Sequence, residues 1–118
     1  METKLIYYSI GDWGATPMSI NQVKYVANVM SNYSYFHIPQ FIVSLGGNFY
    51  ENGVKDIHDT KWDAAWYSMF IKPYPQLKYM KWFSILGNHD YGGGGNSVLA
   101  EIEMTQHCNN WVMPNYEY

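Results

Sequence analysis

The sequence lacks arginine, and this absence narrows the range of partners. All seven basic residues are lysines, and the formal net charge is -3 at pH 7. Without guanidinium groups the chain has no bidentate phosphate clamp, and without a basic surplus it has no positive patch for nucleic acid. We therefore predict no nucleic-acid partner.

Cysteine and long apolar runs are also scarce. Cys108 is the single cysteine, so no disulfide can form within the chain and the redox compartment stays open. No apolar run approaches the roughly 20 residues of a membrane-spanning helix, and no signal-peptide core follows Met1. We predict no membrane span, and the localisation stays unknown.

Apolar and aromatic residues are abundant instead. Hydrophobic residues make up 47% of the chain and aromatic residues 19%, which favours a packed globular protein over a disordered one. A chain of 118 residues can bury one small core. Because no repeat or linker interrupts it, we place no domain boundary within residues 1–118.

The apolar pattern alternates between strand-like and helical segments. Short apolar runs predict strands over residues 4–10, 41–45, 82–86 and 111–114. Apolar spacings of three and four predict helices over residues 19–35, 60–70 and 96–106. This alternation predicts an α/β fold with a mainly parallel sheet and flanking helices.

Local signals refine these boundaries. Ser19, Asp59 and Asn96 stand where short polar side chains cap helices, and the glycines at 92–95 predict a flexible loop. The second helix carries an aromatic stripe that is typical of a core-facing surface. We expect part of this stripe to be exposed and to favour self-association; it consists of Trp62, Trp66, Met69 and Phe70.

Three glycine-anchored loops follow the first three predicted strands: GDWG at 11–14, GGNFY at 46–50 and GNHD at 87–90. In open α/β sheets, ligands bind at the carboxyl ends of the strands. The oxygen and nitrogen donors of these loops suit iron, manganese or zinc, and paired metals about 3.5–4 Å apart can hydrolyse phosphate esters. Taken alone, Asp12 is also typical of a turn and Tyr50 of a packing residue.

In this order the loops resemble the GDxG, GDxxY and GNH[DE] motifs of the purple acid phosphatases, tartrate-resistant type, in the calcineurin-like metallophosphoesterase superfamily. The resemblance implies half of a four-layer sandwich, a phosphate-monoester substrate, and iron with a second divalent metal (iron, zinc or manganese). It implies that Asp12 and Tyr50 bind the first metal and Asn88 the second. It also implies a catalytic pair, in which His89, hydrogen-bonded towards Asp90, stabilises the substrate or protonates the leaving group.

The chain departs from this family pattern at Gly47, which replaces the aspartate that bridges the two metals. The family's further histidine ligands lie in VxxH and GHxH motifs, and none of the four histidines here has that spacing. We therefore expect a fragment or degenerate hydrolase that covers about half of a family domain, binds one ion weakly and has little activity. Restoring Gly47→Asp should strengthen the binding of one ion.

The resemblance leaves a second interpretation open. The segment near Trp111 and the degraded second motif also resemble the glideosome-associated acid-phosphatase-like anchor protein, which implies a catalytically inactive binding or anchoring module. Purple acid phosphatases are usually secretory or lysosomal, whereas this sequence shows no signal peptide.

Overall fold

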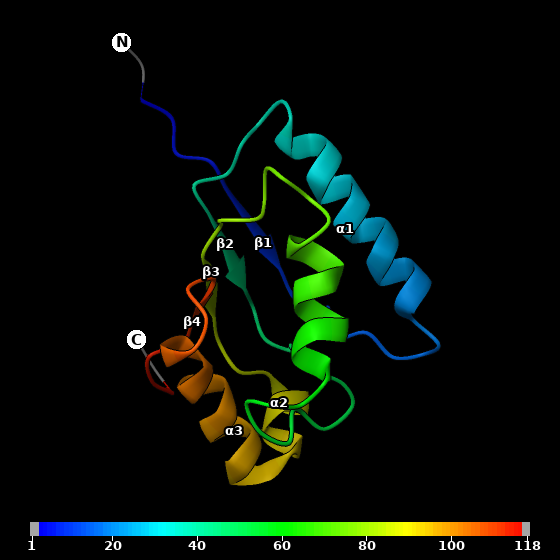
Figure 1. The fold of residues 1–118 in the computed structure, drawn as a ribbon, viewed down its shortest axis with the longest axis vertical. Coiled ribbons are helices and arrows are strands. Elements are labelled where there is room, and N and C mark those ends of the chain that lie inside the picture. The colour runs from blue at the N-terminus through cyan, green and yellow to red at the C-terminus, as the bar shows by residue number, and fades with distance from the viewer. Residues whose placement is uncertain (1–2, 117–118) are drawn as a thin grey trace.

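The computed structural model describes residues 3–116 and contains one four-stranded parallel sheet. The strands lie in the order β1–β2–β3–β4 (Figure 1). Their register places Tyr8 beside Ile42 and Ile42 beside Trp82. The predicted α/β fold with a parallel sheet is confirmed. The strands are β1 (Tyr7–Ile10), β2 (Phe41–Ser44), β3 (Trp82–Ser84) and β4 (Trp111–Val112).

Helical segments connect successive strands. α1 (Ile20–Ser34) joins β1 to β2, and η1 (Trp62–Ile71), which has π-helical hydrogen bonding, joins β2 to β3. Figure 1 shows α1 and η1 side by side in front of the sheet, with α2 and α3 near one end of the strands. α2 (Asn88–Gly92), α3 (Gly94–Glu103) and the short 3₁₀ helix η2 (Met104–Gln106) lie between β3 and β4.

One of the three predicted helix caps is wrong. Ser19 is the N-cap of α1, although its hydroxyl accepts the Thr16 N–H rather than a helical one. Lys61 immediately precedes η1, and the helical turn that leads into η1 begins at Thr60. Asp59 Oδ1 accepts the Lys61 N–H at 2.9 Å, as an N-cap side chain does, so the predicted cap at Asp59 is confirmed. The predicted cap at Asn96 is wrong, since α3 begins two residues earlier.

The glycine run at 92–95 is not the expected loop. Gly92 ends α2, and Gly94 and Gly95 form the first turn of α3. Glycine disfavours helix when nothing else holds it. Here packing of the buried Ser97 and Val98 outweighs that preference.

The core lies between one face of the sheet and the helices. Trp13 is at its centre, with its ring 5.3–6.4 Å from four other aromatic rings. The stripe on η1 belongs to this core, since Trp62 is 6% exposed and Trp66 2%. The expectation that the stripe is exposed is therefore wrong. The rings around Trp13 are those of Phe49, Phe70, Trp82 and Trp111.

The opposite face of the sheet is only partly covered within the described residues. Phe41, Val43 and Phe83 are half-buried there, and Tyr7, which stacks on Phe41 with ring centroids 5.4 Å apart, is 52% exposed. Open apolar surface therefore lies on the sheet and on α1, where Tyr25 and Val29 are exposed, rather than on η1. No helix within residues 3–116 is long and apolar enough to cross a membrane.

Candidate functional site

The three glycine-anchored loops meet at the carboxyl edge of the sheet. The Asp12 N–H donates to Gly46 O at 2.9 Å, and the Gly14 N–H donates to Gly47 O at 3.1 Å. The Gly47 N–H in turn donates to Asp90 Oδ2 at 3.1 Å. Main-chain hydrogen bonds and one carboxylate thus tie the first loop to the second and the second to the third.

The absence of side chains at Gly46 and Gly87 lets the second and third loops touch. A Cβ on Gly87 would lie 2.3 Å from Gly47 N, and one on Gly46, which has φ +95°, would lie 2.8 Å from Gly87 N. Real Cβ atoms do not approach backbone nitrogen so closely. These positions require glycine because the two backbones are in contact there.

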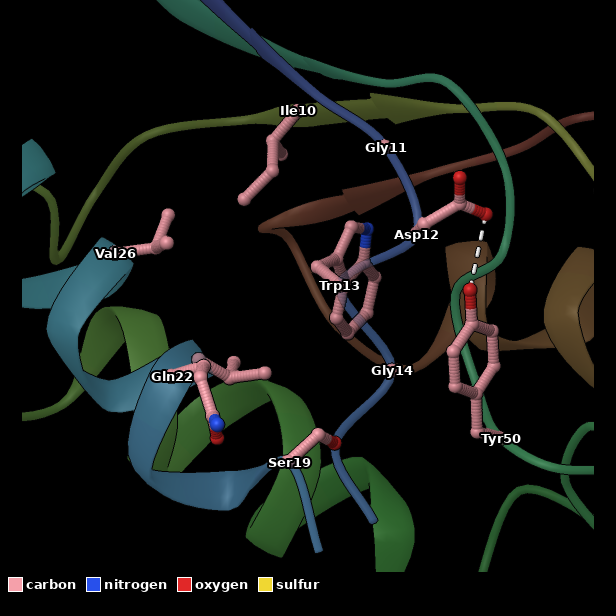
Figure 2. Close-up of a pocket in the computed structure, with 10 residues that line it drawn as sticks. Ile10, Gly11, Asp12, Trp13, Gly14, Ser19, Gln22, Val26 and Tyr50 are labelled. Atoms are coloured by element: carbon pink, nitrogen blue, oxygen red, sulfur yellow. Dashed lines mark hydrogen bonds between the residues drawn. The ribbon is translucent and has the colours of Figure 1, made fainter.

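Asp12 and Tyr50 form the first part of the candidate metal site. The Tyr50 hydroxyl donates to Asp12 Oδ1 at 3.0 Å (Figure 2). Asp12 has φ +52°, a left-handed conformation that is uncommon outside glycine and clusters at functional sites. Burial, followed by the hydrogen bond to Asp12 and its charge, raises the pKa of Tyr50 to about 12. The structure therefore holds a neutral phenol that donates to the Asp12 carboxylate.

His89 and Asn88 come from the start of α2. The His89 ring lies against Tyr50, with ring centroids 4.1 Å apart, and Asn88 is exposed. His89 Nδ1 is 2.7 Å from Glu51 O, and because a carbonyl can only accept, Nδ1 is the protonated nitrogen. The expected hydrogen bond from His89 towards Asp90 is wrong.

Asp90 is buried and bonds to the main chain instead. Its carboxylate accepts four backbone N–H groups at 2.8–3.1 Å. Both of its oxygens are occupied, which explains why His89 turns to Glu51. Asp90 is thus a positioning residue for the second and third loops. The four donors are Gly47, Asn48, Phe49 and Gly87.

The structure contains a buried polar network behind the loops that the sequence analysis did not predict. Asn48 Nδ2 donates to Glu101 Oε1 and to Ile85 O, each at 2.9 Å, and Ser44 Oγ donates to Asn48 Oδ1. Trp13 Nε1 donates to Ser44 Oγ at 2.7 Å. The network joins the second loop to the core and to α3. A polar residue inside an otherwise apolar run, such as Ser44 in β2, was the available signal.

Glu101 is fully buried on α3, and its environment favours the neutral acid. Burial, followed by the charge of Asp90, raises the pKa of Glu101 to about 9, although the hydrogen bond from Asn48 acts in the opposite direction. A raised pKa means that the folded state binds more protons than the unfolded state between about pH 4.5 and 9. The Glu101 contribution to stability is therefore present in full below about pH 4.5 and is lost as the pH rises towards 9.

We expect Glu101→Gln to remove this pH dependence and to raise the free energy of unfolding by about 1–3 kcal/mol near pH 9, because the amide needs no proton. Urea unfolding of both proteins at pH 5, 7 and 9 measures the effect. Glu103→Gln, on an exposed side chain of the same helix, is the matched control and should change little. If the free energy of unfolding changed with pH in the same way in Glu101→Gln and in the unmodified chain, this interpretation of Glu101 would be contradicted.

The structure also shows what occupies the space beside Gly47. A Cβ on Gly47 would lie 2.3 Å from Asp12 Oδ1 and 2.9 Å from Asp12 Cα, at a φ of +67°. The Asp12 side chain thus fills the space that a bridging carboxylate would need. In residues 3–116, no group of three or more His, Cys, Asp and Glu side chains is arranged to hold a metal. Asp12 and Tyr50 supply part of the ligand set that one ion needs. The side chains at this edge do not supply the ligands of a two-metal centre.

The parallel sheet and the polar side chains at its carboxyl edge define an α/β protein with its candidate site at the strand ends. The chain is a partial homologue of the purple acid phosphatases, including the tartrate-resistant type. It is 34% identical over 107 residues to purple acid phosphatase 7 of Arabidopsis thaliana, which is 91% of this chain and 31% of that protein. It is 31% identical over 117 residues to human tartrate-resistant acid phosphatase type 5, covering 97% of this chain and 34% of that protein.

A solved structure with the same fold is GAP50, described as the anchor in the inner membrane complex of Plasmodium. It matches with a TM-score of 0.79 and 30% sequence identity over 97% of this chain and 35% of that chain. The chain therefore spans about a third of the length of the relatives it matches. No protein-family model matches the chain.

Proposed function

We propose that this chain is a degenerate acid-phosphatase relative that binds one divalent cation at the carboxyl edge and has little turnover of its own. The observation that carries the proposal is the pairing of Asp12 and Tyr50 in the space beside Gly47. A carboxylate and a phenol that already converge offer two oxygen ligands to one ion. The same arrangement leaves no side-chain donor at Gly47 to bridge a second ion.

Electrostatics favours one ion over two. Two divalent cations about 3.5 Å apart repel each other by on the order of 20 kcal/mol at an effective dielectric constant of 20. A bridging carboxylate offsets this repulsion, and Gly47 cannot supply one. We infer that a pair comparable to the iron and second divalent metal of purple acid phosphatases does not assemble here.

The remaining site residues have subordinate roles in the proposal. Asn88 is exposed at the start of α2, where its side-chain oxygen could serve as a further ligand. Because His89 Nδ1 donates to Glu51 O, Nε2 is the ring nitrogen left to face a phosphate monoester or its leaving group. Asp90 acts through its four backbone contacts and does not touch the substrate.

The test is isothermal titration of the chain with Mn²⁺ or Zn²⁺. We expect weak binding of one ion and at least a tenfold loss of affinity in Asp12→Asn, because a carboxylate ligand becomes a neutral amide. Asp63→Asn changes an exposed carboxylate on η1 and should leave binding unchanged. Equal binding by Asp12→Asn and the unmodified chain would place the ion elsewhere.

A second candidate function is a binding or anchoring module without catalysis. The similarity to GAP50, itself described as an anchor, favours it. The two candidates differ in their chemistry, because only the hydrolase relative should release phosphate from an aryl phosphate when a divalent ion is supplied. A rate above background that is lost in His89→Ala would favour the hydrolase. A background rate with intact ion binding would favour the module.

A further inference from the structure

The side chain of Glu101 places a carboxyl group behind the loops of the candidate site. Glu101 lies on α3 and is fully buried by other parts of this chain. Its Oε1 accepts an N–H of the Asn48 amide at 2.9 Å, whereas no N–H or O–H donor within residues 3–116 reaches the buried Oε2. An ionised carboxylate with one oxygen buried and unsatisfied is costly. The contacts of Glu101 therefore favour a proton on Oε2.

A hydrogen bond between Glu101 and the carboxyl group of Asp90 gives the same result. Two ionised carboxylates cannot form a hydrogen bond, because each only accepts, so one member of this pair must carry a proton. Asp90 is the acceptor, since its oxygens already accept four backbone N–H groups. Its Oδ1 accepts the Phe49 N–H and shares the Asn48 N–H with Oδ2, which leaves Oδ1 room for one more donor.

The remaining surroundings of Glu101 do not favour its ionised form. From the second loop it meets the uncharged amide of Asn48, and from β4 the Trp111 indole, whose N–H donates to Glu101 O at 2.8 Å. Asp90 is the charged group that acts on it, and the other acid near the end of α3, Glu103, is exposed. Burial, followed by the negative charge of Asp90, raises the pKa of Glu101, in agreement with the position of the proton.

We propose that Glu101 is a positioning residue for the candidate site, a neutral acid whose Oε2–H donates to the Asp90 carboxylate and thereby fixes the second and third loops against α3. The groups involved all belong to this chain, and Glu101 is already fully buried by them. The effect on ion binding rests on the proposed function, whereas the hydrogen bond between the two acids does not.

The loss of this proton has a consequence for the ion site. When Glu101 ionises, two buried carboxylates face each other, and either Asp90 moves away or Glu101 moves towards water. Both movements disturb the backbone contacts of Asp90, one of which is to Gly47, the neighbour of the Asp12 side chain. Cation binding usually strengthens as the pH rises, because ligands lose protons. Here we expect it to weaken instead.

The first test is carbon-13 nuclear magnetic resonance of the side-chain carboxyl groups, with Glu101→Gln to assign the Glu101 signal. We expect a neutral acid at pH 7 that becomes a carboxylate as the pH rises towards 9. The backbone amide signals of Gly47, Phe49 and Gly87 should change over the same pH range in the unmodified chain and in the control Glu103→Gln. They should not change in Glu101→Gln, because its amide donates to Asp90 at every pH.

Two results of this experiment would overturn the proposal, and neither requires a bound ion. One is a Glu101 carboxylate at pH 7. The other is a pH-dependent change in the three amide signals that persists in Glu101→Gln.

The second test is titration with Mg²⁺ at pH 7 and pH 10, with circular dichroism to show whether each variant is folded. Because the pKa of Glu101 is about 9, only about a tenth of the chains keep the proton at pH 10, and the affinity should fall about tenfold. Glu101→Gln should keep its affinity at both pH values. Glu101→Leu, which loses both hydrogen bonds, should bind about tenfold more weakly at pH 7.

An affinity that falls equally with pH in the unmodified chain and in Glu101→Gln would overturn the positioning role. If none of these proteins binds Mg²⁺ at pH 7, the proposed ion site is wrong. The carboxyl and amide signals then still decide whether Glu101 holds the loops.

Discussion

Replacing Asp90 with alanine is expected to lower the free energy of unfolding by about 3–5 kcal/mol, a large share of the 5–15 kcal/mol typical of a small domain. The carboxylate is buried and accepts four backbone N–H groups from the second and third loops. Alanine leaves those donors without an acceptor, and each unsatisfied buried donor costs about 1–3 kcal/mol before water or a local shift offsets part of it. The loops should separate before the sheet unfolds.

Urea unfolding followed by circular dichroism measures this loss. Asp59→Ala is the matched control, because Asp59 also accepts two backbone N–H groups, from Lys55 and Lys61, but in a less buried turn. We expect the control to cost about 1 kcal/mol, as loss of a capping side chain does. Equal losses in the two variants would show that Asp90 does not hold the site together.

Restoring the missing acidic residue with Gly47→Asp is expected to destabilise the metal-free chain by about 2–4 kcal/mol. The left-handed backbone at Gly47 costs a residue with a Cβ about 1 kcal/mol, and crowding in a packed site adds about 1–3 kcal/mol. The crowding arises because the new Cβ would press on both the side chain and Cα of Asp12. The sequence alone predicted only the gain in ion binding, since it does not show that Asp12 fills the space.

The variant Gly94→Asp separates the cost of the left-handed backbone from the cost of crowding. Gly94 has φ +77° but nothing within 4 Å of an added Cβ, so its replacement carries the backbone cost alone. Thermal unfolding of both variants with and without Mn²⁺ measures each effect. We expect Gly47→Asp to be the less stable variant without the ion and to gain more from it, because the ion screens two adjacent carboxylates. Equal stability of the two variants would contradict the crowding argument.

The order of strands and helices was predictable because each follows local rules. The three- and four-residue spacing on α1 gave its bounds to within a residue, and the glycine breaks placed the ends of β2 and β3 to within two residues. The π-helical hydrogen bonding of η1 was not predictable, because its apolar spacing is equally compatible with an α-helix. The helical start of α3 at two glycines depends on the packing of Ser97 and Val98, which cannot be predicted from the local sequence.

The location of the candidate site was predictable, but its internal contacts were not. The rule that parallel strands share a carboxyl edge placed Asp12, Tyr50 and His89 together. Asp90 binds backbone groups more than 40 residues away in sequence. Such contacts cannot be predicted from residue types, because nearly every residue carries the same backbone N–H group. Glu101 reads in sequence as an ordinary polar position on a helix, so its burial could be seen only in the fold.

The most direct test of the central claim is the number of divalent ions bound per chain, measured by equilibrium dialysis and elemental analysis beside an aryl-phosphate assay. The unmodified chain should bind at most one ion at the Asp12–Tyr50 pair, should lose it in Asp12→Asn, and should release phosphate at close to the background rate. Two tightly bound ions per chain with robust hydrolysis would contradict the account, because they would require a bridge that Gly47 does not supply.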